Sequence, residues 1–153
     1  MIFKDITIIS GGQSGVDRAA LDFALENNIL CGGWCPLGRL AEDGIISNNY
    51  PLKETTTSNY EERTNLNVRD SDGTIIIYKN EMDKGTLLTR EIAQYINKHL
   101  IVINLSVYQS FDQIKLKNWI TQNKISVLNI AGPRESFNPG IYKLAHRFLL
   151  ALL

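Results

Sequence analysis

The sequence predicts an α/β protein: a three-layer, Rossmann-like domain with an open, mostly parallel sheet of about five strands and helices on both faces. Short apolar or β-branched runs alternate with amphipathic segments along the chain. Such alternation is typical of parallel strands joined by right-handed helical crossovers, which cover both faces of a sheet. The 153 residues contain no repeat, low-complexity segment or linker, which favours a single domain over residues 1–153.

Five short runs rich in Ile, Leu and Val are predicted to form the strands. The run TIIIY does not alternate between apolar and polar residues, as expected for a strand buried on both faces. The five runs cover residues 6–9, 29–34, 74–78, 100–105 and 126–130. The polar stretch from Pro36 to about Ser58 is predicted to be a long loop, and loops of this length in compact domains are usually functional.

Five segments with apolar residues at helical spacing are predicted to form the helices. They cover residues 16–26, 60–69, 86–98, 111–123 and 140–152. The last segment has an apolar face that is a candidate surface for a homo-oligomer. This face comprises Ile141, Leu144, Ala145, Phe148 and Leu149.

Composition excludes several classes of function. Sixteen basic and sixteen acidic side chains cancel, which argues against nucleic acid as a partner, since nucleic-acid binding usually needs a basic face. No apolar run approaches the roughly 20 residues of a membrane span, and no signal peptide is evident, so we expect a cytoplasmic protein without membrane contact. Cys31 and Cys35 have no nearby His or Cys partner, so no metal site is predicted.

The stretch SGGQSG links the first predicted strand to the first predicted helix. Ligands of open α/β sheets bind beyond the carboxyl ends of the strands, and a helix start offers amides without internal partners. We therefore expect the loop to bind a phosphate or another oxyanion. The expected ligand-binding residues of this loop are Gly11, Gly12, Gln13, Ser14 and Gly15. The alternative is a tight turn in which Ser14 or Asp17 caps the helix.

The stretch KGTLLT follows the third predicted strand and opens the next helix. Gly85, Thr86 and Thr89 are expected to contact the ligand there, although Thr86 is equally suited to be a plain N-cap. Asp70 and Asp72 stand at the entry end of that strand. We expect a structural role for both rather than a metal site.

The stretch AGPRES follows the fifth predicted strand. Gly132, Arg134 and Glu135 are expected at the ligand, because a guanidinium offers a planar fork of donors to an oxyanion. The alternative is a surface pair of Arg134 with Glu135 that contributes little.

The stretch GGWCPLGRLAEDG leaves the second predicted strand. Trp34 is suited to stack on a planar ring but equally to pack in the core, and Arg39 is expected to add a second positive charge to the site.

Several motifs together resemble one known family. They are GGQSGVDRAALDFAL, GGWCPLGRLAEDG, YPLKET, YEERTNLNVRDSDGTIII and LNIAGPRES. In order, and over nearly the whole chain, they are similar to the molybdenum-carrier family. This resemblance implies a circularly permuted member of the SLOG superfamily, Rossmann-like domains related to the lysine-decarboxylase-like phosphoribohydrolases.

The resemblance to the phosphoribohydrolases is incomplete at their signature P-G-G-x-G-T-x-x-E. Thr89 stands at the position of the glutamate, Lys84 stands where a glycine is usual, and Glu91 is expected to point elsewhere on the helix. Cleavage through an oxocarbenium ion normally needs that carboxylate. The resemblance therefore favours binding over hydrolysis.

Three functions remain open from the sequence. The first is binding of a phosphate-bearing small molecule, either a nucleotide or a molybdopterin-type cofactor, as in a molybdenum cofactor carrier. The second is a nucleotide-processing hydrolase that cleaves an N-glycosidic or phosphate bond. The third is a non-catalytic, oligomeric interaction module. A homo-oligomer is expected under all three.

Overall fold

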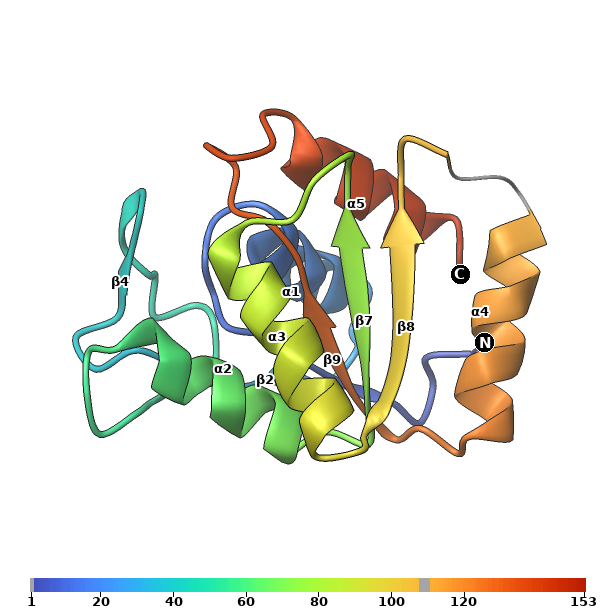
Figure 1. The fold of residues 1–153 in the computed structure, drawn as a ribbon, viewed down its shortest axis with the longest axis horizontal. Coiled ribbons are helices and arrows are strands. Elements are labelled where there is room, and N and C mark those ends of the chain that lie inside the picture. Colours follow the sequence, from blue (N-terminus) through green and yellow to red (C-terminus); the bar gives the residue numbers. More distant parts are fainter. Residues whose placement is uncertain (1, 108–110) are drawn as a thin grey trace.

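The central sheet has five parallel strands, in agreement with the predicted fold class (Figure 1). A computed structural model describes residues 2–107 and 111–153 of the chain. The strand order is β2-β1-β9-β7-β8. The bounds are β1 Thr7–Ile9, β2 Cys31–Gly32, β7 Gly73–Tyr78, β8 His99–Asn104 and β9 Val127–Ala131. Strand β9 lies between β1 and β7, so the last strand of the chain pairs with the first, Thr7 opposite Val127.

Helices cover both faces of the sheet (Figure 1). Helices α1 and α5 pack together behind it, and α2 and α3 pack together in front. Their bounds are α1 Val16–Glu26, α2 Tyr60–Arg69, α3 Lys84–Tyr95, α4 Phe111–Gln122 and α5 Ile141–Leu150. The predicted bounds of the first two helices are confirmed, whereas α3 begins before the predicted residue 86. Among the described residues, no helix is long and apolar enough to cross a membrane.

The main hydrophobic core lies between the sheet and the α1–α5 pair. Phe3 and Phe23 meet edge to face there, with ring centroids 5.4 Å apart. The apolar face of α5 belongs to this core, and its buried residues are Ile141, Ala145, Phe148 and Leu149. The expected oligomer surface on this helix is therefore wrong, because the face is buried against the chain's own core.

The predicted strand 29–34 is divided into two. Strand β2 ends at Gly32, and β3, Trp34–Cys35, leaves the main sheet to pair with β6, Lys53–Glu54. Gly33 turns the chain between them with a φ of 124°, and a Cβ there would lie 2.3 Å from the Ser10 carbonyl oxygen. No other residue fits this turn without strain.

The predicted long loop carries its own structure. It contains β6 and a small hairpin of β4, Leu40–Ala41, and β5, Gly44–Ile45. A second, smaller core joins Cys35, Ala41 and Ile46 beneath it.

The sheet face under α2 and α3 has a polar centre. Asn129 of β9 donates to the hydroxyl of Thr74 on β7 at 3.2 Å, and both side chains are buried.

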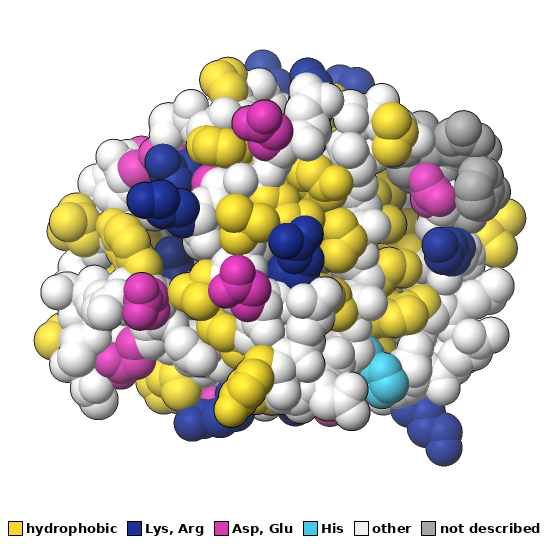
Figure 2. Space-filling model, viewed as in Figure 1, with side chains coloured by type: hydrophobic (Ala, Val, Ile, Leu, Met, Phe, Trp, Pro, Cys, Tyr) yellow, Lys and Arg dark blue, Asp and Glu magenta, His cyan; other side chains and the backbone are white. Residues whose placement is uncertain are grey.

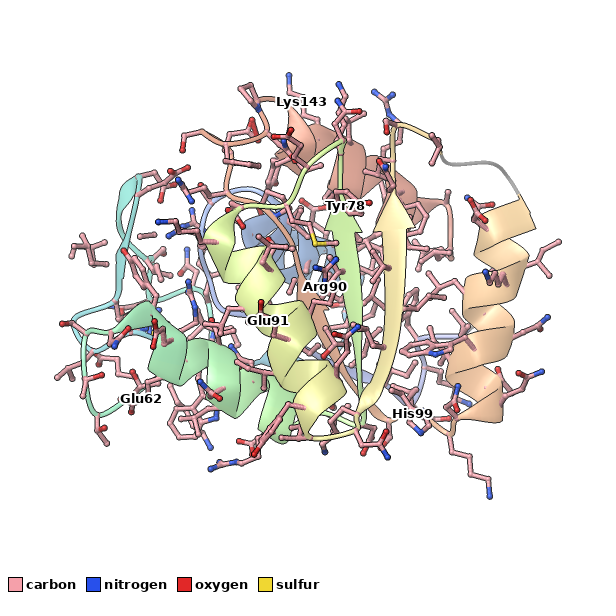
Figure 3. The ribbon with its side chains drawn as sticks, viewed as in Figure 1. Glu62, Tyr78, Arg90, Glu91, His99 and Lys143 are labelled. Atoms are coloured by element: carbon pink, nitrogen blue, oxygen red, sulfur yellow. The ribbon has the colours of Figure 1, made fainter. Side chains whose placement is uncertain are left out.

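On the outer surface of this side of the molecule, Lys and Arg side chains lie among Asp and Glu side chains, beside apolar groups over α3 and β8 (Figure 2). Strand β7 runs toward Tyr78, while His99 marks the opposite, entry edge of the sheet (Figure 3).

Candidate functional site

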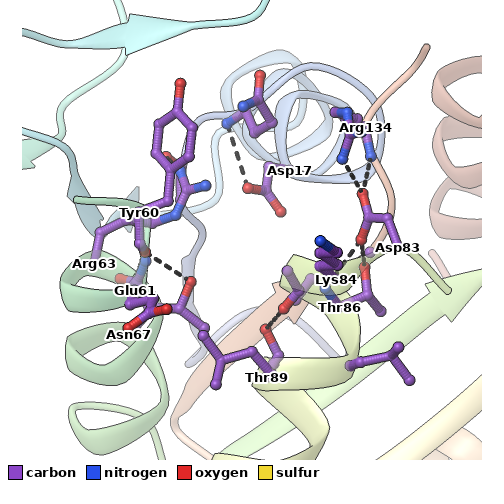
Figure 4. Close-up of a pocket in the computed structure, with 18 of the residues that line it drawn as sticks. Asp17, Tyr60, Glu61, Arg63, Asn67, Asp83, Lys84, Thr86, Thr89 and Arg134 are labelled. Carbon is purple, nitrogen blue, oxygen red and sulfur yellow. Dashed lines mark hydrogen bonds and ion pairs between the residues drawn. The ribbon is translucent and has the colours of Figure 1, made fainter. Parts of the chain in front are cut away.

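A cavity of about 710 Å³ opens above the carboxyl ends of β1 and β9, between α2 and α3 (Figure 4). The glycine-rich loop, the first turns of α1, α2 and α3, and the loop after β9 line it. Its charged lining residues are Asp17, Glu42, Glu61, Arg63, Asp83, Lys84, Glu91 and Arg134. Among the described residues, no group of three or more His, Cys, Asp or Glu side chains is arranged to hold a metal ion.

The structure brings one part of the predicted site residues to this cavity. Those that line it are Gly11, Gln13, Gly85, Thr86, Thr89, Gly132 and Arg134. The others lie outside this lining, and three of them, Ser14, Gly15 and Glu135, line a second cavity of about 550 Å³. The remaining three, Gly12, Trp34 and Arg39, line neither cavity.

The amides of the glycine-rich loop are largely engaged by the protein itself. The Gln13 amide donates to Asp17 Oδ2 at 3.3 Å, and the Ser14 amide donates to the Gln13 side chain at 3.0 Å. The Val16 amide donates to the Pro133 carbonyl at 3.2 Å. Two of the five predicted loop amides, those of Gln13 and Ser14, thus already have an acceptor within the protein, and oxyanion binding by the whole loop stays a prediction.

Close packing explains two of the predicted glycines. A Cβ on Gly15 would lie 2.3 Å from the Pro133 carbonyl oxygen, at a φ of 80° that favours glycine. A Cβ on Gly132 would lie 2.1 Å from the Ile77 carbonyl oxygen. These glycines let the loop after β9 press against the start of α1 and the end of β7.

Ser14 and Glu135 hold the loop after β9 rather than facing the cavity. The hydroxyl of Ser14 accepts the Glu135 amide at 3.1 Å and donates to Glu42. The Glu135 carboxylate accepts the amides of Gly140 and Tyr142, at the start of α5. The alternative surface pair of Arg134 with Glu135 is wrong, because Arg134 pairs with Asp83 and Glu42 instead.

Arg39, in the predicted long loop, and Trp34, in strand β3 just before it, both have structural roles. The Arg39 guanidinium donates to four backbone carbonyls at 2.8 to 3.2 Å, and it thereby closes residues 39–52 on themselves. The Trp34 indole donates to Asp70 at 2.8 Å. Neither side chain is therefore free to contact a ligand in the cavity.

The structural role expected for Asp72 agrees with its three hydrogen bonds from Ser126 and Val127, at the start of β9.

Asp83 caps α3 and binds the loop after β9. Its Oδ1 accepts the amide of Thr86 at 3.0 Å and the hydroxyl of Thr86 at 2.6 Å. Its Oδ2 accepts the amide and the guanidinium of Arg134. Thr86 is therefore not the N-cap that the sequence suggested. The Thr89 hydroxyl donates to its own helix, at the Gly85 carbonyl.

Arg63 of α2 reaches into the cavity from the opposite wall (Figure 4). It is buried, donates to the Gly11 carbonyl at 2.7 Å, and lies over the Tyr60 ring at 5.0 Å. Facing it, Asp17 is only 7% exposed. Burial raises the pKa of Asp17 to about 6, although the charge of Arg63 opposes this rise.

Glu42, at the tip of the β4–β5 hairpin, ties the hairpin to the cavity rim. It accepts the amide and hydroxyl of Ser136 and the hydroxyl of Ser14, and it lies 3.5 Å from Arg134 Nε. Burial alone would raise the pKa of Glu42, but the hydrogen bonds from Ser136 and Ser14 outweigh it, so this pKa lies below its ordinary value. Glu42 therefore stays ionised.

Three further residues show what the sequence analysis missed. Arg63 and Asp83 were not predicted at the site, and Glu91 was expected to point away, yet all three line the cavity. Asp83 had a local signal, because an aspartate three residues before Thr86 has the spacing of an N-cap. Arg63 lies on a polar helix and gave no signal, since its partner at Gly11 is 52 residues away.

Two comparisons relate this fold and cavity to known proteins. The sequence profile of the circularly permutated YpsA SLOG family matches residues 8–153. A crystal structure named "Putative molybdenum carrier protein", from Syntrophus aciditrophicus SB, is 44% identical, covers 96% of this chain and 94% of its own, and superposes with a TM-score of 0.93. No curated protein matches significantly. The family expected from the motifs is confirmed: the chain belongs to the circularly permutated YpsA SLOG family.

Proposed function

We propose that the cavity binds a phosphate-bearing small molecule, a nucleotide or a molybdopterin-type cofactor, and that the protein carries this cargo rather than transforming it. The observation that carries the proposal is the start of α3. The first amides of a helix lack internal acceptors, and Lys84 and Gly85, the first two residues of α3, line the cavity. A helix N-terminus is a ready-made anion site, and the Lys84 side chain adds a full positive charge.

Space and donor chemistry at the cavity suit such a cargo. A volume of about 710 Å³ is in the range of small-molecule and cofactor sites. Arg134, from the loop after β9, places a guanidinium at the same rim, and its side chain is 43% exposed although it pairs with Asp83 and Glu42. We infer that Gly85, Lys84, Gly132 and Arg134 hold the phosphate, while Asn67 and Thr64 of α2 line the space for the rest of the molecule.

The carrier role is supported by the name of the similar crystal structure, "Putative molybdenum carrier protein". The signature glutamate of the phosphoribohydrolases is replaced here by Thr89, whose hydroxyl is directed to its own helix. Both observations favour transport of an intact molecule over hydrolysis. A cytoplasmic location is part of the same proposal and is tested by cell fractionation.

Thermal unfolding against a ligand panel tests the proposal. The panel contains nucleoside mono-, di- and triphosphates, dinucleotides, molybdate, tungstate and the molybdenum cofactor. A ligand at about 100 times its Kd stabilises by roughly 2.7 kcal/mol, which raises Tm by several degrees. Arg134→Ala should reduce the shift, whereas Arg147→Ala, an exposed change on α5, should not. No shift with any member would contradict the proposal.

A nucleotide hydrolase is the second candidate, and Glu91 favours it. This carboxylate lines the cavity from α3, two residues beyond the position where the phosphoribohydrolases have theirs (Figure 3). If it acts as a general acid or base, incubation with nucleotides should release free base or phosphate, and Glu91→Gln should abolish the release. Intact nucleotides after prolonged incubation would leave binding as the function.

A homo-oligomer remains a prediction under either function. The apolar face of α5 does not supply its interface, because that face is buried in the core. Light scattering of the purified chain measures the mass directly, and a mass near 17.2 kDa would contradict the prediction.

A further inference from the structure

The Asp17 carboxyl group has more acceptor capacity than the protein uses. Asp17 is only 7% exposed, and its side chain is directed into the cavity (Figure 4). Within the part of the chain that the structure describes, the Gln13 amide is its one backbone donor, at 3.3 Å. The nearby Ser10 hydroxyl favours the ionised form but donates to the Ile130 carbonyl. A carboxylate has about four acceptor positions, so part of the group faces the cavity unused.

The charges that face Asp17 come from two other walls of the cavity. Arg63 of α2 attracts the ionised form, and Asp83 at the start of α3 repels it. The remaining charged lining residues are Glu42, Glu61, Lys84, Glu91 and Arg134. With every group ionised the lining is net acidic, and Arg134 is already paired with two carboxylates. An oxyanion that enters the cavity therefore meets a lining with an excess of negative charge, to which ionised Asp17 contributes.

We propose that Asp17 contacts the bound ligand in its carboxylic acid form and donates a hydrogen bond to an oxygen of a tetrahedral oxyanion, so that binding at neutral and alkaline pH takes up one proton. This inference rests on the proposed function and deepens it, because it assigns a ligand-contacting residue and the ligand class that fits it. The proton comes from solvent, and no covalent bond forms or breaks. A group with a pKa of about 6 is readily protonated when an anion arrives beside it.

Proton uptake makes a quantitative prediction. Above the pKa of Asp17 in the free protein, the affinity for an oxyanion of fixed charge should fall about tenfold for each pH unit, by linkage. Below about pH 6 the affinity should level off. An asparagine at this position keeps a donor at every pH and retains an oxygen for the Gln13 amide. Asp17→Asn should therefore bind without this pH dependence, and more tightly than the native chain at pH 8.

Sulfate is the probe, because its charge does not change between pH 5 and 8. The full chain is titrated with sulfate by calorimetry at about pH 5.5, 7 and 8, in two buffers with different enthalpies of ionisation. The heat difference between the buffers counts protons directly and needs no variant. Asp17→Asn is compared with Asp5→Asn, the same change at an exposed position near the entry end of β1. This control retains both histidines and should follow the native chain.

Three results would overturn the inference. The first is native sulfate binding that takes up no proton at pH 8. The second is Asp17→Asn that remains folded but loses sulfate at every pH. The third is absence of sulfate binding while a nucleotide or cofactor of the panel binds, which would retain the proposed function and remove the oxyanion from Asp17. If neither sulfate nor any panel compound binds, the proposed function fails as well.

Discussion

The amide and the guanidinium of Arg134 both donate to one oxygen of Asp83, Oδ2, at 3.1 and 3.3 Å. The other oxygen of the same carboxylate caps α3 through Thr86. One buried side chain therefore fixes a helix start against a loop that is 51 residues distant in sequence. The two parts of the proposed phosphate site, the start of α3 and Arg134, are held in register by this contact.

Replacing Asp83 should weaken both the fold and ligand binding. Asp83→Ala removes an N-cap and an ion pair, so we expect a loss of roughly 2 to 4 kcal/mol in the free energy of unfolding, measured with urea. Asp83→Asn keeps the capping oxygen and should lose less than half as much. Equal losses in the two variants would show that the cap contributes little.

The stability of the protein should depend on the ionisation of Asp17. Its folded-state pKa, about 6, lies above the ordinary value of 3.8, so the folded protein holds this proton more tightly than the unfolded chain. The stabilising effect is complete below about pH 4 and is lost as pH rises through about 6. Asp17→Asn avoids the loss, and it should be more stable than the native chain by about 3 kcal/mol at pH 7 and equal to it at pH 4. Urea unfolding at both pH values measures this difference, and a gain that is the same at both would contradict it.

Gly132 should tolerate no side chain. A Cβ at this position would lie 2.1 Å from the Ile77 carbonyl oxygen and 2.5 Å from Val16 Cγ2, so either β7 or α1 must move. We expect Gly132→Ala to lower the free energy of unfolding by at least about 3 kcal/mol, in the range of severe overpacking. Gly38→Ala is the control for space, because a Cβ there meets nothing within 4 Å, although its φ of 89° adds backbone strain. A smaller loss at Gly132 than at Gly38 would overturn this explanation.

Arg39 provides a test between its predicted and its observed role. Its guanidinium holds the carbonyls of Ile46, Ser47, Tyr50 and Leu52. A lysine cannot reproduce this fork of donors. Arg39→Lys should therefore make residues 36–58 faster to cleave by protease, while the affinity for any ligand of the cavity changes less than about twofold. A loss of affinity without faster cleavage would return Arg39 to the binding site.

The sequence was informative wherever the relevant interaction is local. The bounds of α1 and α2 follow from side chains three or four positions apart, and both were predicted as they are observed. The roles of Trp34 and Arg39 depend on partners that the loop brings back from elsewhere, and a positive charge or a ring in a loop does not reveal them. The charged contacts of the cavity, such as Arg63 with Gly11 and Glu42 with Ser136, join residues 52 and 94 positions apart. Only the topology of the sheet determines which of them meet.

The pairing of β1 with β9 has a consequence for the order of events during synthesis. Strand β1 has β2 on one side and β9 on the other, with Thr7 opposite Val127. At about 5 to 20 residues per second, a ribosome needs roughly 6 to 24 seconds to make the chain between them. During this interval one edge of β1 has no strand beside it, and the glycine-rich loop lacks Arg134 and the rest of its wall. The cavity is therefore incomplete until the ribosome has passed Arg134.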